Sequence, residues 1–77
     1  MTELGLYLSR RSINRSDVSR KTGISKTRLS ELSNNADTRL RADELYLIAL
    51  AIGANPCELL NEVCAKLELK KIKNISK

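Results

Sequence analysis

The residues best suited to chemistry in this chain are polar side chains on one side of an expected helix, Thr27, Ser30, Glu31 and Asn34, with Lys26 on the flank of that side. At about 100° per residue, this side lies opposite the apolar positions Leu29 and Leu32. Its ammonium, hydroxyl, methyl and carboxylate groups can donate to guanine, meet a thymine methyl or accept from cytosine. A polar helix face is also expected wherever a helix is simply exposed to solvent. The pattern therefore predicts either a surface that contacts base edges or a solvated face.

The elements that position this face are two short helices within residues 15–34, joined by a tight turn at Gly23. Glycine adopts the left-handed conformation that ends a helix at little cost. Ser25 is placed to cap the second helix, which starts one residue later. The apolar positions of the block are spaced as if two helices crossed at a steep angle and buried their contact: Val18, Ile24, Leu29 and Leu32.

This block, RSDVSRKTGISKTRLSELSN, resembles the helix-turn-helix of phage repressor and Cro-type (XRE-family) DNA-binding proteins. The segment LYLIALAIGANPCELL, residues 45–60, resembles the two helices that follow in that family. The resemblance implies an all-α fold: a compact bundle of five short helices, a lambda-repressor-like DNA-binding domain with its helix-turn-helix at the second and third helices. It also implies that the third helix enters the major groove with its N-terminal half leading. Lys26, Thr27, Ser30 and Glu31 are then the candidate base-reading residues.

Candidate contacts to the DNA backbone surround this face. Arg15, at the first position of the second helix, is the strongest, because exposed N–H groups at a helix start also favour phosphate. The remaining candidates lie on the flank of the third helix, at its end and in the following loop: Arg28, Asn34, Arg39 and Arg41. Glu31 would be repelled by phosphate. We expect it either to read a base donor, to exclude wrong sequences, or to hold Lys26 or Arg28 in place.

Two residues depart from the family pattern. Ser19 stands where the family usually has alanine, and serine is small enough for that close approach between helices. Ser33 stands where a glutamate often pairs with an arginine of the first helix, and Leu8 lies near the position of that arginine. The sequence therefore predicts that this ion pair is absent here.

Charge is strongly segregated along the 77 residues, which carry a net charge of +5. Residues 1–41 contain nine Lys or Arg and four acids, residues 42–63 contain four acids and no base, and residues 64–77 contain five lysines and one acid. A basic helix-turn-helix half is the pattern expected of a surface that faces phosphate.

The other expected helices follow from caps and apolar spacing. Thr2 can cap a first helix that runs to about residue 11 or 12 and carries Tyr7 at the edge of the core. Leu40 and Leu45 are spaced as a hydrophobic staple across the start of the fourth helix. Residues 45–52 are almost all apolar, which predicts a central helix buried nearly all round. Gly53 ends that helix, and Asn55 with Pro56 begins the fifth.

The fifth helix carries more apolar residues than one packing face needs. Four of them are candidate dimer contacts, by analogy with many relatives, with burial in the domain core as the alternative: Leu60, Val63, Cys64 and Leu67. Cys57 and Cys64 lie too far apart along one helix to bridge, and no histidine completes a zinc site, so we expect no metal and two small buried side chains. We assign residues 1–66 to the DNA-binding domain and residues 67–77 to a basic C-terminal tail that either extends the last helix or leaves it.

Several classes of function are disfavoured. The chain has no histidine, no glycine-rich phosphate loop and no metal-ligand cluster, so we expect no enzyme and no cofactor. It has no membrane-length apolar run and no leader pattern, so we expect a cytoplasmic protein without a membrane partner. The favoured interpretation is a transcriptional regulator, a repressor, that binds a palindromic double-stranded operator as a homodimer. The alternatives are an antitoxin-like or adaptor module that binds a protein partner through the fifth helix and basic tail, and nonspecific nucleic-acid binding.

Overall fold

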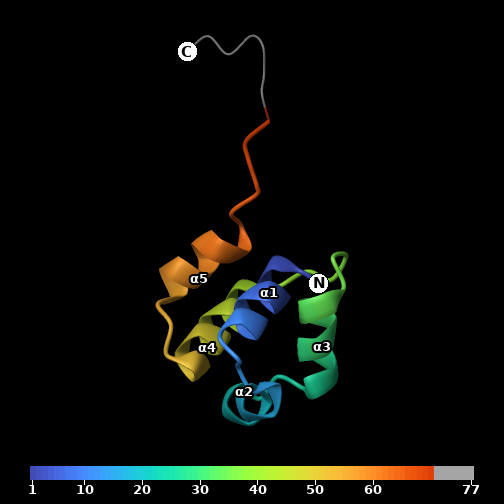
Figure 1. Ribbon diagram of the computed structural model, residues 1–77, viewed down its shortest axis with the longest axis vertical. Coiled ribbons are helices and arrows are strands. Elements are labelled where there is room, and N and C mark those ends of the chain that lie inside the picture. The colour runs from blue at the N-terminus through green and yellow to red at the C-terminus, as the bar shows by residue number, and fades with distance from the viewer. Residues whose placement is uncertain (71–77) are drawn as a thin grey trace.

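The computed structural model describes residues 1–70 of the protein and contains, in that range, five α-helices and no strand (Figure 1). They are α1 (Glu3–Arg10), α2 (Arg15–Thr22), α3 (Lys26–Asn34), α4 (Ala42–Ile52) and α5 (Pro56–Val63). The all-α, five-helix architecture expected from the sequence is confirmed.

Local capping chemistry explains where the helices begin and end. The side chains of Thr2, Asn14, Ser25 and Asn55 each accept hydrogen bonds from backbone N–H groups in the first turn of the following helix. Gly23 ends α2 with φ 82° and Gly53 ends α4 with φ 75°. Both glycines occupy the left-handed region, as expected.

The core is aliphatic apart from one aromatic ring. Helix α1 packs on α3 and α5, α4 packs on α2 and α5, and α2 packs on α3. Leu45 is buried at the start of α4 and Leu40 packs against the core just before it, as the predicted staple requires. The buried apolar residues are Leu4, Tyr7, Leu8, Val18, Leu29, Leu32, Leu45, Ile48, Ala49 and Leu59.

The N-terminus of α1 is joined directly to the C-terminal end of α3. The Ser33 carbonyl oxygen accepts the Thr2 N–H at 2.8 Å, and Thr2 Oγ1 donates to the Leu32 carbonyl oxygen at 2.7 Å. A Cβ added to Gly5 would collide with the Ser33 carbonyl oxygen. The two helices are therefore linked through carbonyl oxygens of α3 and the Thr2 N–H and hydroxyl, at the end of α3 where the sequence predicted no ion pair.

Two sequence-based expectations about burial are wrong. Helix α4 is not buried all round, because Tyr46, Leu47 and Leu50 are 54%, 40% and 55% exposed. The helix packs through its other side, and no element of residues 1–70 covers this apolar stripe. Cys57 is exposed rather than buried, since it lies in the first turn of α5 on the side away from Leu59, and Cys64 at the end of α5 is only half-buried.

The fifth helix ends at Val63, and residues 67–70 belong to no helix. In Figure 1 this segment runs away from the globule, and Lys66 Nζ lies 3.0 Å from Glu3 Oε2 of α1. The rest of the predicted basic tail, residues 71–77, lies outside the described residues. None of the described helices is long and apolar enough to span a membrane.

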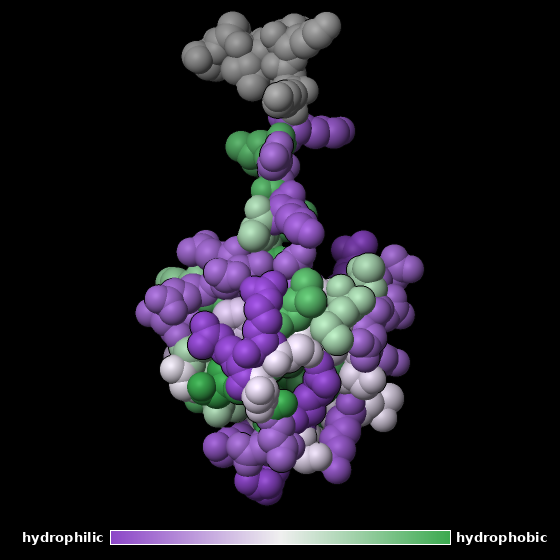
Figure 2. Space-filling view, viewed as in Figure 1, coloured by the Kyte–Doolittle hydropathy of each residue, from purple (hydrophilic) through white to green (hydrophobic). Residues whose placement is uncertain are grey.

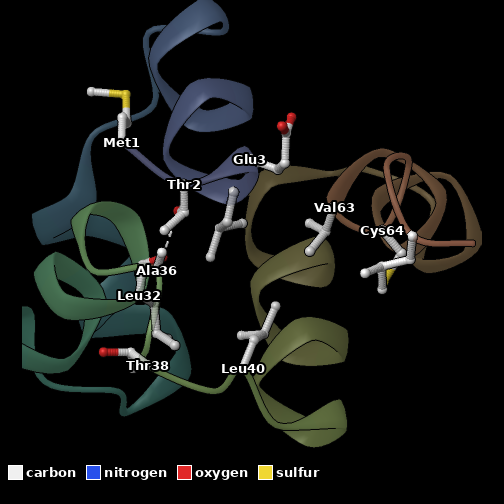
Figure 3. Close-up of a pocket in the computed structure, with 11 residues that line it drawn as sticks. Met1, Thr2, Glu3, Leu32, Ala36, Thr38, Leu40, Val63 and Cys64 are labelled. Atoms are coloured by element: carbon white, nitrogen blue, oxygen red, sulfur yellow. Dashed lines mark hydrogen bonds between the residues drawn. The ribbon is translucent and has the colours of Figure 1, made fainter.

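Val63, Cys64 and Leu67 line a groove of about 490 Å³ between the end of α5, the start of α1 and the loop after α3 (Figure 3). Leu4, Leu32 and Leu40 also line this groove. Three of the four candidate dimer contacts therefore face a groove of the domain itself, whereas Leu60 does not line it and is 48% exposed.

Candidate nucleic-acid interface

The turn between α2 and α3 is held by a short chain of hydrogen bonds. The Gly23 N–H donates to the Ser19 carbonyl oxygen at 2.9 Å, and the Ile24 N–H donates to Thr22 Oγ1 at 3.1 Å. Thr22 Oγ1 in turn donates to the Val18 carbonyl oxygen at 2.7 Å. Figure 1 shows α2 nearly end-on and α3 in side view, so the two helices cross steeply. This is the arrangement predicted from the apolar spacing.

The outer face of α3 carries the four candidate base-reading residues, Lys26, Thr27, Ser30 and Glu31, and all four are exposed. The side chains of Lys26, Thr27 and Glu31 make no hydrogen bond or ion pair within residues 1–70. Asn34 differs, because its Nδ2 donates to the Ser30 carbonyl oxygen at 3.1 Å and lies 3.5 Å from Ser30 Oγ. The face therefore presents a donor, a hydroxyl with a methyl, and an acceptor that are not used inside the domain.

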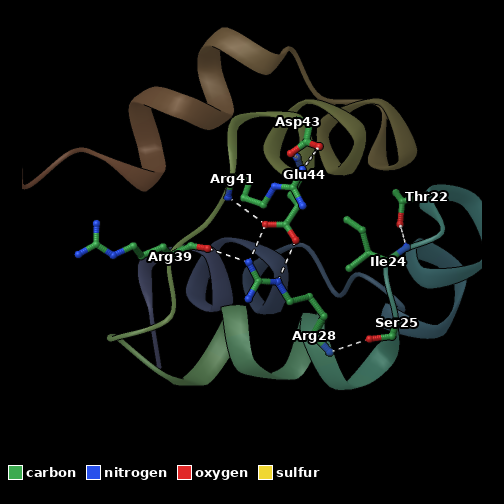
Figure 4. Close-up of polar contacts among 8 residues, drawn as sticks. All are labelled: Thr22, Ile24, Ser25, Arg28, Arg39, Arg41, Asp43 and Glu44. Carbon is green, nitrogen blue, oxygen red and sulfur yellow. Dashed lines mark hydrogen bonds and ion pairs between the residues drawn. The ribbon is translucent and has the colours of Figure 1, made fainter.

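Arg28 lies on the flank of α3 and points toward α4 (Figure 4). Its Nε donates to Glu44 Oε2 at 2.8 Å and its Nη2 donates to Glu44 Oε1 at 3.0 Å, a bidentate pair. The same Nη2 donates to the Arg39 carbonyl oxygen at 2.8 Å. The hydrogen-bonded carboxylate raises the pKa of the Arg28 guanidinium above its ordinary value.

Glu44 is the buried partner in this arrangement, with only 10% of its side chain exposed. Its Oε1 also accepts the Arg41 N–H at 2.9 Å, which satisfies a free donor at the start of α4. The hydrogen bond from Arg28 lowers the pKa of Glu44 below its ordinary value, although burial acts in the opposite direction.

Arg15 is half-buried at the start of α2. Its Nε and Nη2 are enclosed and have no hydrogen-bond partner among residues 1–70. Enclosed donors without a partner are costly, so an acceptor reached by a change of rotamer would be favourable. This is compatible with a phosphate contact but requires the side chain to rotate outward.

The remaining basic residues around α3 are exposed. The Arg39 side chain extends away from the domain while its carbonyl oxygen binds Arg28 (Figure 4). Arg41 Nη2 lies 2.9 Å from Asp43 Oδ2 at the surface. On the outer side of α2, Arg20 and Lys21 both pair with Asp17. The structure thus brings Arg39 and Arg41 to the loop that follows the exposed face of α3.

The family model described as the Cro/C1-type HTH DNA-binding domain matches residues 3–65 of the chain, which include the α2–turn–α3 unit and the three other helices, α1, α4 and α5. The protein belongs to this family. No curated protein and no solved structure matches the sequence. Membership of the Cro/C1-type family identifies the chain as a DNA-binding regulator and makes double-stranded DNA its partner.

Three residues of this Cro/C1-type domain have structural roles that were not predicted from the sequence. The sequence predicted no role for Glu44, and it placed Arg28 against the DNA backbone or beside Glu31. No ion pair within residues 1–70 joins Glu31 to Lys26 or Arg28. The available signal was the position of Glu44, three residues after the helix cap, where glutamate often binds backbone N–H groups. Thr22 was also missed, and its signal was a hydroxyl one residue before the terminating glycine.

Proposed function

We propose that this Cro/C1-type protein is a sequence-specific regulator, a repressor, that reads the major groove with α3. One observation carries the proposal: the exposed face of α3 displays Lys26, Thr27 and Glu31 with their polar groups free of internal partners within residues 1–70. Buried leucines on the opposite side hold α3 against the core, so this face has a fixed orientation.

The proposal distinguishes contacts to base edges from contacts to the DNA backbone. Lys26, Thr27, Ser30 and Glu31 discriminate between bases, at about 1–3 kcal/mol for each good contact. The cations Arg15, Arg39 and Arg41, with the Asn34 amide at the end of α3, hold the DNA backbone. The cations supply affinity that falls as salt concentration rises.

On the face drawn in Figure 2 the globule is mostly hydrophilic, with small apolar patches between polar side chains.

The protein acts as a homodimer on a palindromic operator whose half-sites lie about 34–36 Å apart, one turn of the duplex. Leu60 is the strongest of the candidate dimer contacts because it is exposed and lies outside the groove. Val63, Cys64 and Leu67 would contribute if a partner copy entered the groove shown in Figure 3.

A second candidate function is a protein-interaction module, and the exposed stripe Tyr46, Leu47 and Leu50 on α4 favours it. Exposed apolar residues gathered on one helix side often mark interaction sites. An antitoxin-like or adaptor protein would use this surface together with α5 and the basic tail, whether or not it also binds DNA.

The deciding experiment is selection of bound duplexes from a random-sequence pool at physiological ionic strength, where nonspecific binding weakens to about 10⁻⁴–10⁻⁶ M. We expect enrichment of a two-fold symmetric motif, and sedimentation of the purified protein should give the mass of a dimer. A folded protein that enriches no motif would remove the regulator proposal and leave the interaction module. An enriched motif without symmetry, bound by a monomer, would remove only the dimer.

A further inference from the structure

Helix α3 is held on three sides, and one of these attachments consists of side chains alone. Its C-terminal end meets α1 through Thr2, Gly5 and Ser33, and its N-terminal end follows the turn from α2. Between α3 and α4, by contrast, no Cα atoms come within 8 Å anywhere in the described helices. The Arg28–Glu44 pair spans this separation.

We propose that Arg28 is a positioning residue, which sets the orientation of α3 and the course of the α3–α4 loop rather than holding a phosphate itself. This inference rests on the proposed function. Its basis is that three hydrogen bonds of 2.8–3.0 Å engage the Nε and Nη2 of Arg28 with Glu44 and with the Arg39 backbone.

The position of Arg28 in the chain connects it to both kinds of DNA contact. It follows Lys26 and Thr27 directly, so its attachment to α4 acts on the half of α3 that leads into the groove. Its bond to the Arg39 carbonyl oxygen, together with the bond between Glu44 Oε1 and the Arg41 N–H, fixes the loop that carries two backbone candidates. A guanidinium is suited to this role because its planar fork can bind a carboxylate with two parallel bonds and still reach a third acceptor.

Glu44 lies in the acidic segment 42–63, and a carboxylate is unexpected close to a surface that binds DNA. A carboxylate close to phosphate weakens binding by repulsion. Glu44 is paired with Arg28 and only 10% of its side chain is exposed. It can therefore orient Arg28 and α3 while presenting little negative charge to the DNA.

Three substitutions distinguish positioning from direct phosphate contact: Arg28→Lys, Arg28→Gln and Glu44→Gln. They change the net charge by zero, minus one and plus one, so a purely electrostatic role predicts three different outcomes. If Arg28 positions α3, all three variants lower the ratio of affinity for the selected motif to affinity for random duplex. The expected decrease is about 5- to 150-fold, the discrimination supplied by one good base contact. Arg28→Lys is decisive, because lysine keeps the charge but cannot form the fork.

Asp43→Asn is the matched control for Glu44→Gln. It removes one negative charge from the same turn of α4, but the Asp43 side chain is 59% exposed and its ion pair with Arg41 lies at the surface. Asp43 Oδ1 also accepts the Glu44 N–H at 2.9 Å, and the amide oxygen of asparagine can accept the same bond. We expect it to raise affinity for all duplexes slightly and to leave discrimination unchanged. Ile48→Val controls for stability, because it weakens the core without touching the polar groups between α3 and α4. All measurements are made where circular dichroism shows each variant folded.

A different set of results would overturn the inference. If Arg28 holds a phosphate, Arg28→Lys should keep most of the specific affinity, Arg28→Gln should reduce the salt slope by about 0.9, and Glu44→Gln should bind more tightly by releasing the arginine. Equal loss in Ile48→Val at matched stability would also contradict positioning. A wild-type protein that shows no sequence preference would remove the proposed function as well, whereas preference retained in all three variants would remove this inference alone.

Discussion

The Ser33 carbonyl oxygen accepts the Thr2 N–H at 2.8 Å and lies 3.0 Å from Thr2 Oγ1. A single backbone acceptor at the end of α3 therefore binds the residue that caps α1. Helices α1 and α3 are thus joined by hydrogen bonds from the Thr2 N–H and hydroxyl to main-chain carbonyl oxygens, without an ion pair between these two helices in the described residues. Because the contact depends on close approach rather than on charge, it should be sensitive to added volume and insensitive to salt.

Gly5→Ala tests this close approach. Alanine favours a helix by about 1 kcal/mol over glycine, so propensity alone predicts stabilisation. The added methyl group would instead collide with the Ser33 carbonyl oxygen. We expect a net loss of about 1–3 kcal/mol in the free energy of unfolding, as for other overpacked sites. Urea unfolding measures it, and a gain in stability would mean that the helices separate at little cost.

Ser33→Ala should have the opposite effect. Ser33 is fully buried, and its Oγ has no hydrogen-bond partner among residues 1–70. Burying a hydroxyl without a partner costs roughly 1–3 kcal/mol, part of which its removal should recover. We expect unchanged or increased stability, with the backbone bonds to Thr2 intact. A marked loss in thermal unfolding would show that the hydroxyl has a partner in solution, such as a buried water.

Acid should weaken the domain through Glu44. Its pKa in the folded protein lies below the ordinary value of 4.5, so the unfolded chain takes up the proton first. The stability it contributes is complete above the unfolded pKa and is lost as pH falls through the folded pKa. Urea unfolding at a series of pH values should therefore show an acid limb that Glu44→Gln makes shallower. Asp43→Asn, which removes an exposed acid, should reduce the loss of stability in acid less than Glu44→Gln does.

Arg15→Gln and Lys26→Gln each remove one positive charge, but they should have different effects on DNA binding. Arg15→Gln should weaken all duplexes by a similar factor and reduce the salt slope by about 0.9, as expected for one phosphate contact. Lys26→Gln should change the preferred bases, at a cost of about 1–3 kcal/mol at the affected position. Lys21→Gln serves as the control, because Lys21 pairs with Asp17 on the outer side of α2. Identical behaviour of the two variants would show that the division of roles is wrong.

Much of this protein could be predicted from local sequence because local chemistry decides it. Caps at Thr2, Asn14, Ser25 and Asn55, and left-handed glycines at positions 23 and 53, act within a few residues of themselves. Helical spacing also identified the exposed face of α3, since Leu29 and Leu32 must lie opposite it. These signals were sufficient to place the helices and the exposed side of α3, whereas the base-reading role of that side comes from the family resemblance and stays a prediction.

Tertiary structure decided the features that depend on which helices meet. The apolar run of α4 predicted burial on all sides, but in so small a domain α4 packs only on α2 and α5, which leaves Tyr46 and Leu50 exposed. The partner of Arg28 was likewise not local, because Glu44 lies 16 positions away and reaches it only when α3 and α4 are placed by the core. Spacing along the chain determines which side of a helix is apolar. Only packing determines which apolar sides are covered and which charges find each other.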